Sequence, residues 1–175
     1  MIVQDEKRFN CCESVLIMVD EGHTLQGYES NIMKAASSLG GGVGGWGSAC
    51  GAMTGAVIAL GLVHGTDGGE ALGDFKDKRG HLKELNRVLM KEFEEAFGSV
   101  NCNDRLGLDR RTEKFKARYN EMKAQGLTKC DDYINWAAKR VLETPSAKAE
   151  LFSSDLSMQV ILFNLEGFLV DSTYQ

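Results

Sequence analysis

A run saturated with glycine constrains the fold of this chain more than any other feature. Six of the eight residues from Gly40 to Gly47 are glycine. Gly40 follows a segment with helical periodicity, and glycine just after such a segment is a usual way for a helix to end. Through Cys50 the run opens directly into a mostly apolar segment that reaches Val63. One helix must therefore stop at this run and another must begin after it.

The segment after the run is predicted to be the central helix, over residues 49–64, with Ser48 as its N-cap. Gly51, Gly55 and Ala59 recur in it every four residues, and small side chains on one helix face let a second helix approach closely. Cys50 lies at the start of this helix, where unpaired backbone N–H groups and the helix dipole favour a thiolate. We therefore expect Cys50 to have a lowered pKa and to be the residue that carries chemistry.

The rest of the chain also has helical periodicity. Pro145 is the single proline, so no proline interrupts a helix before it. The apolar positions predict helices over 4–21, 29–39, 74–97, 110–124 and 129–143, with a brief helical piece over 104–108. No internal repeat is evident, and no other segment has a convincing strand pattern. The predicted fold class is all-α, a helical bundle of about five to six helices.

The sequence divides near its proline. Residues 1–143 are predicted to form one cysteine-bearing helical domain, and 144–175 a C-terminal extension. The apolar stretch Met158–Leu165 is consistent with either a helix or a strand. We expect this extension to pack on the body of the protein or on a partner in a homodimer.

Charge and composition exclude several function classes. The net charge is −5, and no run of lysine or arginine occurs, which argues against nucleic-acid binding. Local basic pairs such as Arg110-Arg111 are interpreted as solvated helix faces. No stretch reaches the 18 or so apolar residues of a membrane span. The N-terminus does not have the pattern of a signal peptide, so a cytoplasmic location is expected.

The chain has five cysteines, an odd number, at Cys11, Cys12, Cys50, Cys102 and Cys130. Structural disulfides are rare in a reducing compartment, which leaves metal ligation, redox cycling or plain burial. No Cys-x-x-Cys or other local metal motif occurs. Adjacent cysteines on a helix diverge by about 100°, so Cys11 and Cys12 seldom ligate one ion together. Four cysteines lie near the ends of predicted elements, and helix ends can converge at one end of a bundle.

The surroundings of these cysteines resemble a known pattern. The segments that carry the resemblance are Asn10-Cys11-Cys12-Glu13-Ser14-Val15-Leu16, Cys50-Gly51-Ala52-Met53-Thr54-Gly55, Ser99-Val100-Asn101-Cys102 and Lys129-Cys130. From Phe9 to Glu143 the chain resembles the C-GCAxxG-C-C family of redox-active proteins. A related module accompanies the haem domain of split-Soret cytochromes, where it is associated with an iron–sulfur cluster. The haem portion is absent from this sequence.

The resemblance implies a role for four of the cysteines. It makes Cys11, Cys50, Cys102 and Cys130 the metal ligands of an iron–sulfur cluster, [2Fe-2S] or [4Fe-4S], and Cys12 an extra cysteine. Thiolates suit such clusters. Backbone at the glycines, with Gly47 and Gly51 as the predicted cofactor-binding positions, would approach the cluster and donate N–H···S hydrogen bonds. The expected function is electron transfer with an unidentified redox partner.

Three other interpretations stay open at this point. Cys50 can be the nucleophile of a thiol–disulfide redox protein, with a second cysteine as its resolver. Four cysteines can form a structural zinc site. The protein can also be a helical assembly module whose thiols are buried and inert.

Overall fold

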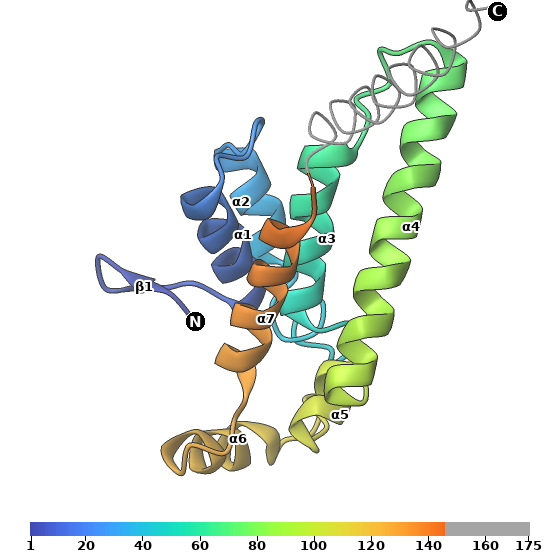
Figure 1. The fold of residues 1–175 in the computed structure, drawn as a ribbon. Helices are drawn as coiled ribbons and strands as arrows, with labels where there is room; N and C mark the ends of the chain where they lie inside the picture. Colours follow the sequence, from blue (N-terminus) through green and yellow to red (C-terminus); the bar gives the residue numbers. More distant parts are fainter. Residues whose placement is uncertain (146–175) are drawn as a thin grey trace, which may run out of the picture. The chain divides into compact units, whose positions relative to one another are not determined.

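The computed structural model describes residues 1–145, of which Met1–Thr144 form one compact unit. Seven helices and one short hairpin make up the described part (Figure 1). Their bounds are β1 Val3–Gln4, β2 Lys7–Arg8, α1 Cys11–Gly22, α2 Ser30–Ser37, α3 Gly51–His64, α4 Leu72–Phe97, α5 Cys102–Leu106, α6 Phe115–Ala124 and α7 Cys130–Glu143. The predicted all-α bundle is confirmed, with seven helices in place of five to six. The C-terminal extension predicted for 144–175, including Met158–Leu165, lies almost wholly outside the described residues.

Helices α1, α3 and α7 pack against one another and form the centre of the core. In Figure 1 all three begin at the end of the unit where α5 lies. Leu16 from α1, Met53 from α3 and Ile134 from α7 are fully buried there. The small residues of α3 allow this packing, because a Cβ added at Gly55 would lie 2.6 Å from the carbonyl oxygen of Cys12. The close helix approach predicted from the small-residue spacing is confirmed.

An aromatic cluster joins α4 to α7. Phe93 and Phe97 of α4 lie against Tyr133 and Trp136 of α7, with ring centroids 4.8–5.8 Å apart. Edge-to-face pairs of this kind add stability beyond the area they bury. The cluster fixes the C-terminal end of the 26-residue helix α4 near the start of α7.

The N-terminal helix is shorter than predicted. Residues 3–8 form a hairpin with Asp5 and Glu6 at its turn, and α1 begins only at Cys11. Asn10 ends the extended segment because its side chain accepts the N–H groups of Cys12 and Glu13 and so caps the helix. Asp5 and Glu6 both have positive φ, as a two-residue hairpin turn requires, but they are not the Asn-Gly pair that signals such a turn in sequence.

The glycine run forms a left-handed turn. Five consecutive residues, 41–45, have φ between +59° and +76°, a region that is costly for residues with a side chain. The turn is closed by hydrogen bonds from Gly45 N–H to the carbonyl of Gly40 and from Gly47 N–H to that of Gly41, both 3.1 Å. The density of glycine in this run follows from this conformation.

Residues 48–50, which follow the turn in an extended conformation, pair with residues 100–102 at the start of α5. Cys50 N–H donates to the carbonyl of Val100 (2.8 Å), and Cys102 N–H donates to that of Ser48 (2.7 Å). Helix α3 consequently starts at Gly51 with Cys50 at its N-cap position, so the prediction of Ser48 as N-cap is wrong. The Ser48 hydroxyl donates to the Gly42 carbonyl instead.

The helix predicted over 110–124 starts at Phe115. Asp109 comes just before the predicted range, and its carboxylate accepts the N–H of Arg111 at 3.0 Å. Such local side-chain bonds compete with helix formation. The brief piece predicted over 104–108 is helix α5, two residues earlier.

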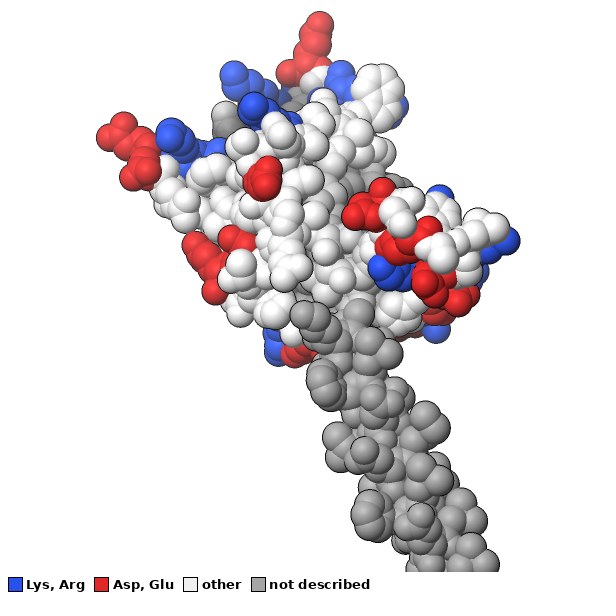
Figure 2. Space-filling view, turned by 90° about the horizontal axis from the view of Figure 1, so that it is seen from above, with Lys and Arg blue, Asp and Glu red and all other residues white. Residues whose placement is uncertain are grey.

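No helix among residues 1–145 is both long enough and apolar enough to cross a membrane. On the face drawn in Figure 2, acidic and basic side chains are interspersed around the margin, and the middle is largely uncharged. This face therefore carries no broad patch of one sign.

Candidate functional site

The structure brings four of the five cysteines together. Cys11, Cys50, Cys102 and Cys130 line one small buried cavity of about 10 Å³. Each lies at the beginning of a different helix: three are the first residues of α1, α5 and α7, and Cys50 is at the N-cap position of α3. Leu106 and Tyr133 are among the residues that close the cavity. Residues up to 119 positions apart therefore meet at one end of the bundle.

The cysteines are free thiols in close contact. Cys11 and Cys130 share a hydrogen bond. A Cβ added at Gly42 would lie 2.7 Å from that of Cys102, and one added at Gly51 would lie 2.9 Å from that of Cys11. Glycine at these two positions therefore makes room for two of the thiols.

A larger pocket adjoins the thiols. It has a volume of about 400 Å³ and is lined by Cys11, Cys102 and Cys130 together with Gly40, Gly41, Gly44, Arg110 and Tyr119, among others. Cys50 does not line it, so that thiol faces only the small inner cavity. Three of the four thiols are thus accessible from a pocket of a size that holds small molecules.

The family of the chain follows from this set of cysteines and its surroundings. A family model described as "Putative redox-active protein (C_GCAxxG_C_C)" matches residues 9–144, which include all four cysteines. The chain belongs to this family. No curated protein and no solved structure matches it. The resemblance seen in the sequence is confirmed, and the family description supports a redox-active protein.

The remaining cysteine of this C-GCAxxG-C-C protein lies apart from the other four. Cys12 is fully buried in the core against Gly55 of α3 and lines neither cavity. Burial raises the pKa of Cys12 to about 11, although a hydrogen bond with Thr54 opposes the shift. Cys12 therefore acts as a core side chain.

Of the two predicted cofactor-binding glycines, one lies at the thiols and the other does not. Gly51 contacts Cys11, whereas Gly47 packs on the side chain of Asn103, which a Cβ at position 47 would overlap. The N–H of Gly47 is already bonded to the carbonyl of Gly41. Neither Gly47 nor Gly51 lines the two cavities.

The expectation of an acidic Cys50 is wrong. Burial raises the pKa of Cys50 to about 11, and the backbone N–H groups of Ala52 and Met53 oppose this shift without overcoming it. Desolvation of the charged form outweighs the effect of the helix start. Burial therefore disfavours the thiolate form of Cys50.

Cys130 has the most acidic thiol of the four. The hydrogen bond with Cys11 lowers the pKa of Cys130 to about 7; burial opposes the shift, and the Tyr119 hydroxyl supports it. The same bond, with burial, raises the pKa of Cys11 far above its usual range. Burial also raises the pKa of Cys102, against the charge of Arg110.

Arg110 and Tyr119 are site residues that the sequence did not reveal. The interpretation of Arg110-Arg111 as a solvated pair is correct for Arg111, which pairs with Asp109 on the surface, but wrong for Arg110, which lies in the pocket wall. Two adjacent arginines in a polar segment carry no signal that separates these roles. The guanidinium of Arg110 stacks on the rings of Phe115 and Tyr119.

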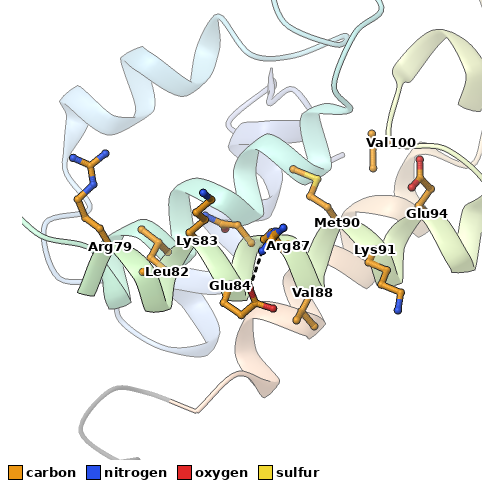
Figure 3. A pocket seen from close by; sticks show the side chains of 12 residues that line it. Arg79, Leu82, Lys83, Glu84, Arg87, Val88, Met90, Lys91, Glu94 and Val100 are labelled. Atoms are coloured by element: carbon orange, nitrogen blue, oxygen red, sulfur yellow. Dashed lines mark hydrogen bonds and ion pairs between the residues drawn. The ribbon is translucent and has the colours of Figure 1, made fainter. Parts of the chain in front are cut away.

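A wider hollow lies away from the thiols, along α4. It has a volume of about 1120 Å³ and is lined almost entirely by that helix, with Val100 at one end (Figure 3). Figure 3 shows basic and acidic side chains on its walls, with an ion pair between Arg87 and Glu84. No cysteine or histidine lines it, so it is separate from the cysteine site.

Proposed function

We propose that this chain is a redox protein in which Cys11, Cys50, Cys102 and Cys130 hold one iron–sulfur cluster for electron transfer. The observation that carries the proposal is the shared cavity of these four thiols, each from a separate helix start. Four thiolates are the ligand set that two-iron and four-iron clusters require. When bound, such a cluster accepts and releases single electrons.

Four thiolates are the donor set of an iron–sulfur cluster and also of a tetrahedral zinc ion. Among residues 1–145 no three Cys, His, Asp or Glu side chains are arranged as the ligands of one metal ion, so the thiols must move apart to bind either centre. The cavity of about 10 Å³ holds no more than a water molecule. Room for a larger group lies in the adjoining pocket of about 400 Å³. Loading therefore requires the contact between Cys11 and Cys130 to open.

The protein itself supplies a dry and positively polarised environment. Cys50 and Cys102 are buried, and the ring of Tyr133 closes the inner side of the cavity. The helix starts of α3 and α7, which have no side-chain cap, place N–H groups near the sulfurs, which stabilises negative charge there. A buried anionic centre is tolerated only with such compensation.

Metal and sulfide analysis tests the proposal. Protein purified without oxygen should be brown and contain iron and acid-labile sulfide in similar amounts. Cys50→Ser should lose the visible absorption band and most of the iron, and Cys12→Ser, as the matched control, should keep both. A colourless preparation without iron contradicts the proposal, and bound zinc without sulfide supports a structural zinc site instead.

A second function is favoured by one specific contact. Cys11 and Cys130 share a hydrogen bond, and the pKa of Cys130 is lowered to about 7, which is the arrangement of an attacking thiolate beside a resolving thiol. In this case two thiols lose two hydrogen atoms and form one disulfide, with an external disulfide as oxidant. Peptide mapping of protein treated with oxidised glutathione detects a Cys11–Cys130 link if this function applies.

Two further parts of the proposal concern the surroundings of the protein. We propose a cytoplasmic location, because a reducing compartment keeps five free cysteines reduced.

We also propose a homodimer that exchanges electrons with a separate redox partner. Light scattering of the purified protein gives its mass in solution, and a monomer contradicts the dimer.

A further inference from the structure

Arg110 occupies an unusual place beside the thiols. It lies in the loop between α5 and α6 and forms part of the wall of the pocket of about 400 Å³. Its guanidinium stacks on the rings of Phe115 and Tyr119, with distances to the ring centroids of 4.4 and 5.9 Å. Its backbone N–H donates to the side chain of Asn103 at 3.0 Å. Both the backbone and the guanidinium of Arg110 are thus held in place.

Within the described residues the charge of Arg110 has no carboxylate partner. None of the ion pairs formed within residues 1–145 includes it, and its Nε atom is buried without a hydrogen-bond acceptor. The adjacent Arg111 differs, because it makes bonds of 2.8 Å to both oxygens of Asp109 and is 50% exposed. Burying an unpaired charge is costly, so a compensating negative group is expected near Arg110.

The groups that face Arg110 are thiols. It forms a hydrogen bond with the sulfur of Cys102, and its charge also acts on Cys130 and on the hydroxyl of Tyr119. Sulfurs are therefore the negative groups within its reach.

The glycine turn leaves space for the guanidinium of Arg110, which packs closely against Gly41. A Cβ added at Gly41 would lie 2.7 Å from Nη2 and 2.9 Å from Cζ of Arg110. Any other residue at position 41 would displace the guanidinium from the sulfurs. Gly47 contributes indirectly, since its missing side chain makes room for Asn103, which holds the Arg110 backbone.

We infer that Arg110 is the resident counter-ion of the sulfur centre and favours its reduced state. This inference rests on the proposed function of the four thiols as one redox centre. Reduction adds negative charge in a buried place, where a fixed cation has a strong effect. Hydrogen bonds and charges around the ligating sulfurs are what tune the potential of such a centre. Arg110 acts through the sulfurs and is a positioning residue, not a ligand.

Charge-changing variants test this role. In Arg110→Gln the equilibrium should shift toward the oxidised form by at least tenfold, which lowers the midpoint potential by about 59 mV for a one-electron centre. Arg110→Lys should keep most of the wild-type potential. Arg111→Gln, which removes the neighbouring paired charge, should leave the potential unchanged. Iron and sulfide content, measured in parallel, should stay the same in all three variants.

Two outcomes overturn the inference: equal potentials in Arg110→Gln and Arg111→Gln, or a higher potential in Arg110→Gln. If Arg110→Gln does not fold, Phe115→Leu removes the stacking and keeps the charge in the chain. It should lower the potential by a smaller amount, and no change would again contradict the inference.

The same variants keep this inference separate from the cluster proposal. If wild-type protein contains no iron or sulfide, the cluster proposal fails, and the potential is measured for the dithiol and disulfide forms in glutathione buffers. Reduced thiols carry more negative charge than a disulfide, so Arg110→Gln should again favour the oxidised form. Equal potentials of wild type and Arg110→Gln in those buffers reject the counter-ion role whatever the centre is.

Discussion

Cys50 and Cys130 show how position and burial compete at a single residue. Both lie at helix starts, yet the pKa of Cys50 is raised to about 11 and that of Cys130 is lowered to about 7. The difference is a partner: Cys130 has hydrogen bonds with Cys11 and Tyr119, whereas burial dominates at Cys50. A cysteine in a sequence motif therefore reveals its chemistry only with its neighbours in view.

Alkylation of reduced, metal-free protein across pH should separate these thiols. Labelling of Cys130 should reach half its maximum near pH 7, because its thiolate persists above that pKa. Cys50 should react only near pH 11. In Cys11→Ala the half-point of Cys130 should move upward, since the hydrogen bond that lowers its pKa is lost. Labelling of Cys50 at a lower pH than Cys130 would contradict this.

Val43 is the one residue with a side chain within the left-handed turn. Its φ is +59°, and it is 42% exposed, so it loses little burial if replaced. Val43→Gly should raise the free energy of unfolding by about 1 kcal/mol, because a β-branched residue is strained in this region. Urea unfolding measures the change.

The control is Val88, for which replacement by glycine should lower the free energy of unfolding. Val88 is similarly exposed, at 46%, but lies in the middle of helix α4. Val88→Gly should destabilise the protein by about 0.5 kcal/mol, because glycine is a poor helix former. If both variants change stability in the same direction, strain at Val43 is not the cause.

At the scale of elements, the packing of α1 against α3 depends on glycine. In Gly55→Ala the new methyl group would lie 2.6 Å from the backbone oxygen of Cys12, which cannot rotate away. We expect a loss of about 1–3 kcal/mol in the free energy of unfolding, as for other overpacked cores. Thermal or urea unfolding gives the value.

The same helix offers a control for this change. Gly61 has no atom within 4 Å of an added Cβ, so Gly61→Ala meets no obstacle. It should stabilise the protein by about 0.5–1 kcal/mol through helix propensity alone. A stabilising effect of Gly55→Ala as well would show that the two helices are not in close contact.

Most helices could be predicted from the sequence because their apolar periodicity is local. The errors fall at the first residues of helices, because a single side chain determines where each helix begins. Helix α1 begins later than expected because Asn10 caps it. Helix α6 begins later because the Asp109 carboxylate accepts the Arg111 N–H. A two-residue strand pair around Asp5 and Glu6 has no periodic signal at all. Caps and turns of this kind are individual hydrogen bonds, and periodicity does not report them.

At the scale of the whole molecule, the sequence predicted which four cysteines belong together. It did not predict which other residues surround them. Family resemblance assigned Cys11, Cys50, Cys102 and Cys130, and the common direction of α1, α3 and α7 brings them together (Figure 1). The role of Arg110 depends on a loop that folds back beneath Gly41, a contact between residues 69 positions apart. No short motif encodes such a contact.

If the four cysteines hold the proposed cluster, its removal should lower the free energy of unfolding of the whole unit. A group held by four helix starts binds the folded state only, and tight binding of this kind contributes several kcal/mol. Treatment with a chelator and an oxidant should therefore lower the melting temperature by at least about 5 °C. Cys12→Ser, which leaves the four ligands intact, should show the same difference between loaded and metal-free protein. Identical melting curves before and after treatment would contradict a shared centre.

The placement of the four thiols at helix starts has a consequence for assembly. Fully buried side chains of the core, such as Leu16, Phe93 and Ile134, do not lie at the helix starts, although Cys50 belongs to the same cluster. A helix start can open by one turn while the rest of the helix stays packed. The fold can therefore form before the proposed cluster is inserted, and the pocket lined by Gly40, Gly41 and Gly44 is the route by which it would enter.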